Sequence, residues 1–475
     1  MKSKIIAIII TILFISCQKQ IQEPISINGV WESIGSGWVL QIQDSTQYTL
    51  YDVTDISCLP NRQASLEEIR SSLSLQKDTL SLQKGVMTYR FTRATEIPTH
   101  CTIPISTTQK QDVLYNFEVF AQTVKEHYVF MELNQIDWPE LYQQQKEKIL
   151  NNPTDPQLYK TIEETLELLG DNHAYLEATD AVYEALEALE EEQEEPSAEE
   201  ALVEYGDFQI ANMVADTYLT EDMTKDSWLI KWGTMENNVG YMQVKAMWLY
   251  AALDIPQALI DEVGYVDAYV TTFHTMNEGT YIQKEVAGIA KTMDQIMNDL
   301  KDTQAMIIDV RFNGGGQDAV SFEILKRFND QRRQTVKTKL KHNNGFSPEL
   351  PLFMDTSPTA YKKPVYVLTS QQTGSAAEAF AISSMSIPYH KRIGAHTQGA
   401  LSTALEKTLP NGWSFSISNE IYMDVHGNSY ENRGVPVDYK LDYPKDRQDF
   451  FRYIAHNLTV DKQQVLEAMK ALEVN

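Results

Sequence analysis

The stretch KPVYVLTSQQTGSAAE, residues 363–378, decides how this chain is interpreted. Residues 365–368 form an apolar run typical of a buried strand, a turn follows at Ser375, and the residues from Ala376 onward are typical of a helix start. A serine at such a corner has its hydroxyl at a helix N-terminus, where backbone N–H groups favour negative charge. Acyl transfer by a serine nucleophile needs that environment. Ser375-x-x-Glu378 is also the pattern of a capping box, a common device with no catalytic role.

A second strand-and-loop segment lies upstream. Residues 305–310 are another buried-strand pattern, and they run into RFNGGG at 311–316. Glycines there let the backbone approach a ligand and point its N–H groups at it. The pattern Gly314-x-Gly316-x-x-Ala319 is a weak nucleotide-binding signal, but three residues separate the strand from the first glycine and no Gly-Lys-Ser/Thr follows. We therefore favour a nucleophile on one loop and oxyanion donors on both.

Composition sets the outer bounds. The chain has 475 residues, a length typical of about three domains, and it is 43% hydrophobic and 22% charged, as globular proteins are. The net charge is −26, which argues against a nucleic-acid partner because phosphate binding needs clustered Lys and Arg.

The N-terminus is predicted to be a signal peptide, residues 1–17. Lys2 and Lys4 precede an apolar run, residues 5–15, that is too short to span a bilayer. Phe14-Ile15-Ser16-Cys17 resembles a bacterial lipoprotein cleavage box, with Cys17 as the lipidated residue and 18–26 as a tether. A plain signal peptide with an incidental cysteine is the alternative. We expect an exported lipoprotein of the bacterial cell envelope, on the periplasmic side or in the outer membrane, with no other membrane contact.

Two further cysteines, Cys58 and Cys101, remain after export. In an oxidising compartment they form either a disulfide or a pair of buried thiols, and the sequence leaves both open.

Hydrophobic periodicity divides the rest of the chain. Short alternating runs predict a small antiparallel β domain at 27–105, and a helical period predicts a helical subdomain at 110–180. Residues 181–205 are an acidic helix and linker, 206–445 alternate strands and helices as an α/β core with a mostly parallel sheet does, and 446–475 are C-terminal helices.

Three local expectations can be tested by a structure. In the helical subdomain, His127 falls off the apolar face and is expected to be solvated. The helix at 155–169 ends at Gly170, a fitting C-cap, immediately before Asp171-Asn172-His173. In the core, residues 413–417 and 421–423 resemble short paired strands after the Asn411-Gly412 turn.

A serine nucleophile needs a base, and the chain has nine histidines. His173 at the helix end is the first candidate, although a lone histidine there is commonly structural. His396, in a loop after the core strands, is the competing base. A carboxylate should orient the imidazole, and Glu431 in YENRGVPVD is the candidate, with a surface carboxylate as the alternative.

Four segments together resemble the tail-specific, or C-terminal-processing, serine peptidases over roughly residues 110–445. They are Asp309-x-Arg311-x-Asn313-x-Gly315-Gly316, Thr373-Gly374-Ser375-Ala376-Ala377-Glu378, Gly394-x-x-Thr397-x-Gly399 with Leu409-Pro410-Asn411-Gly412, and Glu431-x-x-Gly434-Val435-Pro436-x-Asp438. Each is weak alone, and their order and combination carry the resemblance.

The resemblance also indicates a branch. The processing proteases use a serine–lysine dyad, but the positions of that lysine and a following glutamine hold Ala400 and Ala404 here. The chain is instead similar to the branch of the tricorn core and the interphotoreceptor retinoid-binding protein. That similarity implies a site of Ser375, His173 and Glu431, with Asn172 where tricorn has a serine. It also implies a ClpP/crotonase-like core, and the interval between Gly206 and Gly240 is too short for the PDZ domain of many relatives.

The resemblance then implies a mechanism. His173 takes the Ser375 proton, Glu431 steadies the imidazolium, and the N–H groups of Gly315 and Ala376 hold the oxyanion. Asp309 and Arg311 support the glycine loop, no metal or cofactor is required, and the partner is a polypeptide substrate. The alternative is a ligand- or peptide-binding protein that keeps the fold without turnover.

Overall fold

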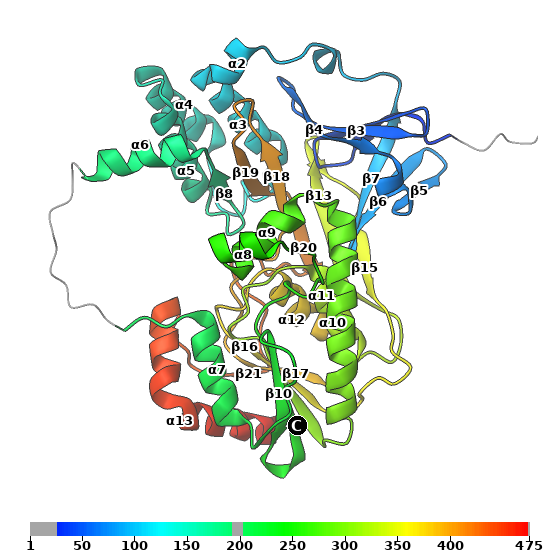
Figure 1. Ribbon diagram of the computed structural model, residues 1–475, viewed down its shortest axis with the longest axis vertical. Coiled ribbons are helices and arrows are strands. Elements are labelled where there is room, and N and C mark those ends of the chain that lie inside the picture. The colour runs from blue at the N-terminus through cyan, green and yellow to red at the C-terminus, as the bar shows by residue number, and fades with distance from the viewer. Residues whose placement is uncertain (1–25, 192–202, 474–475) are drawn as a thin grey trace, which may run out of the picture.

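The computed structural model describes residues 26–191 and 203–473. The expected signal peptide and Cys17, and part of the acidic linker, lie outside the described residues. Figure 1 shows two tiers along the long axis, with the N-terminal sheet and the helical segment at one end and the α/β core at the other. Within the described residues, no helix is both long and apolar enough to cross a membrane.

The N-terminal segment is one antiparallel sheet of seven strands, in the order β4-β3-β2-β1-β7-β6-β5. Its alternating side chains bury Trp31, Leu40, Leu80 and Phe91 on one face, so the predicted all-β segment is confirmed. The strands are β1 (Gly29–Ser33), β2 (Trp38–Gln43), β3 (Gln47–Val53), β4 (Cys58–Ser65), β5 (Leu73–Gln76), β6 (Thr79–Lys84) and β7 (Met87–Ala94), with the short helix α1 (Glu67–Arg70) between β4 and β5.

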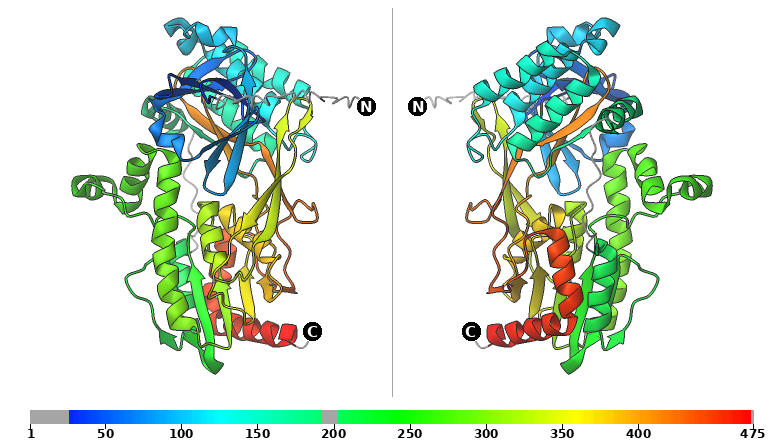
Figure 2. Two further views of the ribbon diagram at one scale, coloured as in Figure 1. Left: turned by 90° about the vertical axis from the view of Figure 1, so that its right-hand side faces the viewer. Right: turned by 90° about the vertical axis from the view of Figure 1, so that its left-hand side faces the viewer.

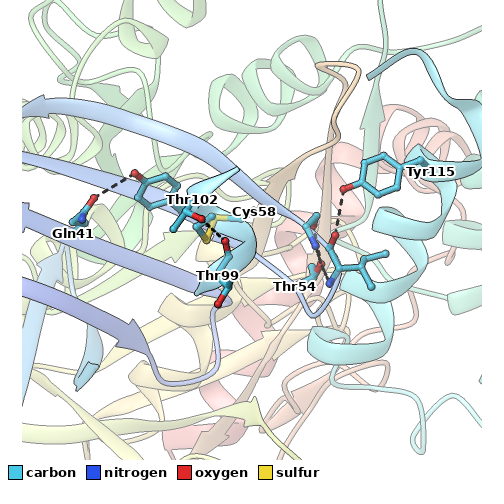
Figure 3. The surroundings of a disulfide bond; sticks show 10 residues. Gln41, Thr54, Cys58, Thr99, Thr102 and Tyr115 are labelled. Atoms are coloured by element: carbon cyan, nitrogen blue, oxygen red, sulfur yellow. Dashed lines mark hydrogen bonds between the residues drawn. A yellow bond between two sulfur atoms is a disulfide. The ribbon is translucent and has the colours of Figure 1, made fainter. Parts of the chain in front are cut away.

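A disulfide joins Cys58 at the start of β4 to Cys101 in the 3₁₀ helix η1 (Thr99–Thr102). Figure 3 shows that Tyr115 of the helical segment reaches toward the neighbouring loop that contains Thr54. Its hydroxyl donates to the carbonyl of Ile56 at 3.2 Å. The disulfide therefore ties the end of the sheet to the chain that leads into the helices.

The helical segment contains α2 (Thr107–Gln111), α3 (Val113–His127), α4 (Trp138–Asn151), α5 (Asp155–Leu169) and α6 (Asp180–Glu191). Gly170 caps α5 in the left-handed region, at φ 63°, as its sequence predicted. The expectation that His127 is solvated is wrong, because the residue is only 7% exposed. Burial, together with the positive charges of the nearby Lys407 and Lys341, lowers the pKa of its imidazole to about 3. The N-terminal sheet covers this end of α3, and the helical period of α3 alone could not reveal that.

The core is a seven-stranded sheet in the order β21-β17-β16-β12-β11-β10-β9. The five strands from β21 to β11 are parallel, and β10 and β9 add antiparallel pairs. The strands are β9 (Glu221–Asp222), β10 (Ile230–Met235), β11 (Val239–Val244), β12 (Ala305–Asp309), β16 (Val365–Thr369), β17 (His390–Gly394) and β21 (Tyr439–Lys440).

Helices cover both faces of this sheet. Along β12, Met306 and Ile308 belong to one apolar cluster and Ala305 and Ile307 to another, as alternating side chains of a strand buried on two sides should. The first cluster includes residues of α10 (Glu278–Leu300), α11 (Asp318–Lys326) and α12 (Ala376–Ser384), and the second includes residues of α7 (Asp207–Tyr218) and α13 (Arg447–Glu473). The hairpin of α8 (Gln257–Val263) and α9 (Tyr265–His274) projects sideways from the core (Figure 2). A short 3₁₀ turn, η2 (Glu236–Asn238), precedes β11.

Two small sheets connect the tiers. One has the order β18-β19-β8, from β18 (Ala404–Thr408), β19 (Ser414–Ser418) and β8 (Tyr175–Glu177). The other joins β14 (Gly345–Phe346), β13 (Arg333–His342), β15 (Leu350–Met354) and β20 (Glu420–Asp424). The predicted pairing of 413–417 with 421–423 is wrong, because β19 pairs with β18 and β8 while β20 pairs with the distant β13.

Candidate active site

Two loops meet at the carboxyl edge of the core sheet, where ligands bind in open α/β folds. They follow the neighbouring parallel strands β12 and β16. The Gly374 N–H donates to the carbonyl of Asn313 at 3.1 Å, and Thr373 Oγ1 donates to the carbonyl of Val310 at 2.9 Å. These bonds fix the glycine-rich loop against the loop that carries Ser375.

Ser375 has a strained backbone, at φ 51° and ψ −123°, immediately before α12. A non-glycine residue adopts this region only where its surroundings hold it, and such residues cluster at functional sites. Here the Ser375 N–H donates both to the carbonyl of Ala400, at 3.1 Å, and to Glu378 Oε2, at 3.2 Å. Ser375 lines a cavity beside this turn.

The Glu378 carboxylate is fully buried and organises the turn. Beyond Ser375, it accepts from the N–H groups of Gly399 at 2.7 Å and Ala400 at 2.6 Å, and from Thr397 Oγ1 at 2.5 Å. Burial raises its pKa to about 7, and these four donors oppose that rise. The glutamate that the sequence marked as a capping residue thus also anchors the loop from Thr397 to Ala400 beside the serine.

His173 meets the serine. Its Nε2 lies 3.1 Å from Ser375 Oγ, in hydrogen-bonding reach. Asp171 sets the histidine loop: it accepts from the His173 N–H at 2.9 Å and from the N–H and hydroxyl of Ser418 at 2.6 and 2.7 Å. Ser416 Oγ donates to the carbonyl of His173 at 2.5 Å. Strand β19 therefore holds the loop that presents the imidazole.

The surroundings of His173 favour its neutral form. Burial lowers the pKa of the imidazole, and the nearby charge of Asp171 opposes the change. A neutral imidazole has one ring nitrogen free to accept a proton. The other ring nitrogen, Nδ1, is buried and has no hydrogen-bond partner among the described residues.

Glu431 forms no hydrogen bond to the imidazole among the described residues. Its Oε2 accepts from the N–H groups of Leu401, at 2.9 Å, and Ser402, at 3.2 Å. Burial, followed by the charge of Glu378, raises the pKa of Glu431 to about 8. The expected hydrogen bond from His173 to Glu431 is absent from the part of the chain that is described, because the carboxylate is turned to the backbone of the 401–402 turn.

The two remaining candidates, Asn172 and His396, have different hydrogen-bond partners. Asn172 lies at the site's rim, where its side-chain amide donates to the carbonyl of Gly399 at 3.4 Å and to Asn432 Oδ1 at 3.3 Å. His396 is exposed, and its Nδ1 lies 3.3 Å from the carbonyl of Arg433 rather than near the serine. Of the two histidines considered as the base, His173 is the one that reaches Ser375.

The backbone donors near the serine differ from the expected pair. Gly315 N–H donates to Asn313 Oδ1 at 2.9 Å, so it is already engaged, which corrects the expectation that it faces an oxyanion. No hydrogen bond from Ala376 N–H or Gly316 N–H occurs among the described residues. Gly316 lines the same cavity as Ser375 and His173. Among the described residues, Ala376 and Gly316 therefore offer unengaged N–H donors beside Ser375.

Gly315 instead permits the close approach of the two loops. A Cβ atom on it would lie 2.6 Å from the Cβ of Ser375, and its φ is +112°. Behind it, Arg311 is fully buried and pairs at 2.7 Å with both Asp309 and Asp461 of α13. The geometry agrees with supporting roles for Arg311 and Asp309.

The cavity beside Ser375 and His173 has a volume of about 260 Å³. Residues of the core, of the loop 401–404 and of the N-terminal sheet line it together. Among the described residues there is no group of three or more His, Cys, Asp or Glu side chains placed to hold a metal ion. Sequence reasoning missed Asp171, Glu378 and Gly316 as parts of the site, although each lies inside a motif that it quoted.

Comparisons with known proteins identify a similar sequence family and similar folds. Residues 262–441 match the model of Peptidase family S41. A candidate peptidase from Parabacteroides merdae ATCC 43184 has a similar crystal structure, with a TM-score of 0.51 at 20% identity over 73% of this chain and 96% of that one. Mature CPAF is similar with a TM-score of 0.52 at 12% identity, over 77% of this chain and 99% of its own. At these identities the two structures are evidence for the fold.

Proposed function

Because this chain belongs to the tail-specific peptidase family S41 and is a serine-type peptidase, we propose that Ser375 is its nucleophile and His173 its general base. The observation that carries the proposal is the 3.1 Å approach of His173 Nε2 to Ser375 Oγ. The strained turn at Ser375 and the free N–H of Ala376 beside it support the same assignment.

The proposed reaction is peptide hydrolysis in two stages. His173 Nε2 takes the hydroxyl proton while Ser375 Oγ bonds to the substrate's carbonyl carbon, and the π electrons move onto the carbonyl oxygen. The tetrahedral species collapses to an acyl-enzyme, and the imidazolium gives its proton to the leaving amine. Water, deprotonated by His173, then attacks the ester carbonyl, and as the acid leaves the imidazolium returns this proton to Ser375 Oγ. The substrate is a polypeptide.

The oxyanion would be held by the N–H groups of Ala376 and Gly316. Both belong to residues that line or adjoin the cavity, and both lack another partner among the described residues. Losing one such donor typically costs about 10²–10³ in rate.

We propose that Glu431 orients His173 in the substrate complex. Its Oε2 is committed to the 401–402 turn, and its Oε1 has no hydrogen bond among the described residues. We assign it to the buried Nδ1 of His173 once substrate closes the site, since catalytic hydrogen bonds often tighten only in the bound complex. Ala400 at the position of the dyad lysine supports the tricorn-like branch, because no ammonium lies there to act as the base. A ClpP/crotonase-like description of the core belongs to the same proposal.

We also propose that the protein is exported and carried on the envelope by lipid at Cys17, so that it reaches its substrates in the periplasm. The support is the cleavage-box pattern Phe14–Cys17 and the disulfide of Cys58 with Cys101, which forms in oxidising compartments. Metabolic labelling with a palmitate analogue tests it, with Cys17→Ser expected to lose the label.

The function is tested by hydrolysis of fluorescein-labelled casein and of a mixture of random octapeptides. The wild type should cleave, whereas Ser375→Ala and His173→Ala should each lose at least about 10⁴-fold in kcat. His396→Ala should stay within a few-fold of wild type. Full activity of His173→Ala with loss in His396→Ala would overturn the base assignment. Stable binding of peptides with no turnover by the wild type would favour a non-catalytic binding protein.

A further inference from the structure

The cavity at Ser375 continues into a second one, of about 360 Å³, that reaches the N-terminal sheet. The two share seven lining residues, namely Lys84, Tyr89, Glu278, Gln317, Thr403, Ala404 and Glu406. The N-terminal sheet, which carries no catalytic group, therefore forms one wall of the cleft that a substrate must enter. The opposite wall is the start of α10 and the end of α9.

An ion pair bridges these walls at the junction of the two cavities. Lys84 Nζ, at the end of β6, lies 2.6 Å from Glu278 Oε2, in the first residue of α10. The same ammonium lies 4.9 Å from the ring centre of Trp38 and 5.5 Å from that of Tyr89. The rings of Trp38 and Tyr89 and the Glu278 carboxylate therefore surround one ammonium group, which belongs to Lys84.

A second carboxylate lies beside this pair and shares the charge of Lys84 without a direct ion pair of its own. Glu406, on β18, lines both cavities and forms no ion pair in the described chain. Its strand neighbour on β19 is Ser416, and its side chain accepts a hydrogen bond from Tyr175, two residues after His173. Counting Lys84, Glu278 and Glu406, the junction carries one more negative than positive charge. His274 of α9 also lines the second cavity.

We propose that this junction is a subsite for a basic side chain of the polypeptide substrate, and that Lys84 occupies it in the free enzyme. A substrate lysine or arginine would take the place of the Lys84 ammonium on Glu278, between Trp38 and Tyr89, with Glu406 as its second carboxylate. The exchange is feasible because solvent reaches both partners, with the Lys84 and Glu278 side chains 20% and 54% exposed, and ion pairs open to solvent contribute little to stability. The inference rests on the proposed peptidase function and adds the substrate class and the role of the N-terminal sheet.

The test reads cleavage sites by mass spectrometry in a mixture of random octapeptides that are acetylated and amidated, so that only side chains are charged. For the wild type, one position near the scissile bond should be enriched in Lys and Arg over Gln by about tenfold, the effect of one well-placed charge. Glu406→Gln should lower this enrichment several-fold, and Glu406→Lys should replace it by enrichment of Asp and Glu. Lys84→Gln should increase it, because the internal competitor is removed. Glu147→Gln, an exposed carboxylate on α4, is the matched control and should change nothing.

Cleavage without any enrichment of basic residues would overturn the subsite while leaving the peptidase proposal intact. Enrichment of acidic residues that is lost in Lys84→Gln would also overturn the proposed subsite. Lys84 would then bind a carboxylate of the substrate instead of giving way to a basic side chain. If the wild type cleaves no peptide, retention of the same mixture on immobilised Ser375→Ala still decides the question. Preferential retention of Lys and Arg peptides, lost in Ser375→Ala/Glu406→Lys, supports the subsite, and unselective retention rejects it.

Discussion

Ser375 Oγ and His173 Nε2 lie 3.1 Å apart, although 202 residues separate them in the chain. The serine belongs to the edge of the core sheet, and the histidine precedes β8 of the small sheet β18-β19-β8. The pair therefore forms only when the core, the small sheet and the helical segment are docked together.

At low pH, the rate of Ser375 acylation should depend on the protonation of His173. Burial lowers the pKa of its imidazole from the ordinary value of 6.5, and the base acts only when neutral. Acylation should therefore be constant near pH 7 and fall only below pH 6.5. Asp171 raises the same pKa, so Asp171→Asn should move this fall to still lower pH. Rates of fluorophosphonate labelling between pH 4.5 and 8 measure both, and a midpoint above 6.5 in the wild type would contradict the assignment.

Gly315 and Gly314 give a matched pair. A methyl group on Gly315 would lie 2.6 Å from Ser375 Cβ, at φ +112°, whereas one on Gly314 would meet nothing within 4 Å. Gly315→Ala should lose at least about 10²-fold in labelling rate, because small displacements of reacting groups cost that much. Gly314→Ala should stay within a few-fold. Equal effects of the two changes would show that the contact with Ser375 does not matter.

The docking of the N-terminal sheet on β18 depends on a buried ion pair. Lys407 Nζ of β18 lies 2.7 Å from Asp52 Oδ1 of β3, with side chains 3% and 6% exposed, and it also donates to the carbonyl of Ser36. Lys407→Met leaves the carboxylate unpaired and should lower the free energy of unfolding by about 3–5 kcal/mol, with part recovered in Asp52→Asn/Lys407→Met.

Urea denaturation measures this change. The control is Lys440→Met, whose pair with Asp442 is 71% and 91% exposed and should matter by less than about 1 kcal/mol. A Lys407→Met protein as stable as the control would mean that the pair does not hold the N-terminal sheet to β18.

The contribution of Glu431 to stability should fall as pH rises from 4.5 to 8. Burial raises the pKa of Glu431 from 4.5 to about 8, so in this window the unfolded chain releases a proton that the folded chain keeps. Its stabilising contribution is complete below pH 4.5 and is lost as pH passes 8. A pKa difference of one between the folded and unfolded chain corresponds to about 1.4 kcal/mol, which makes a few kcal/mol an upper bound for this group.

Glu431→Gln cannot ionise and should flatten the dependence of melting temperature on pH between 5 and 9. Glu378 and Glu420, whose pKa values burial raises to about 7, should keep part of the slope. Glu147→Gln is the exposed control. An unchanged slope in Glu431→Gln would show that this carboxyl group titrates normally.

Local sequence signals predicted much of the framework. The strand before Ser375, the helix after it, the glycine loop and the cap at Gly170 all depend on residues close in the chain. The nucleophile candidate came from one such local pattern. His173 was singled out because it follows a helix end, and the family resemblance supplied its partner.

Contacts between distant segments could not be predicted in this way. His127 is buried because the N-terminal sheet, near Gly37, covers the face of α3 that its own period marks as polar. The pairing of β20 with β13 joins strands that approximately 80 residues separate. The Asn411-Gly412 turn favoured a pairing of the adjacent strands instead, and no local pattern indicates the distant partner. The engagement of Gly315 by Asn313 depends on one side-chain rotamer, which no spacing rule fixes.

The most direct test of the account is the site of modification by diisopropyl fluorophosphate, mapped by peptide mass spectrometry. We predict a single adduct on Ser375 in the wild type at pH 8, retained in His396→Ala and lost in His173→Ala, whose fold is checked by circular dichroism. An adduct on Ser375 that forms at the wild-type rate in folded His173→Ala, or no adduct in an active wild type, would contradict a serine activated by this histidine.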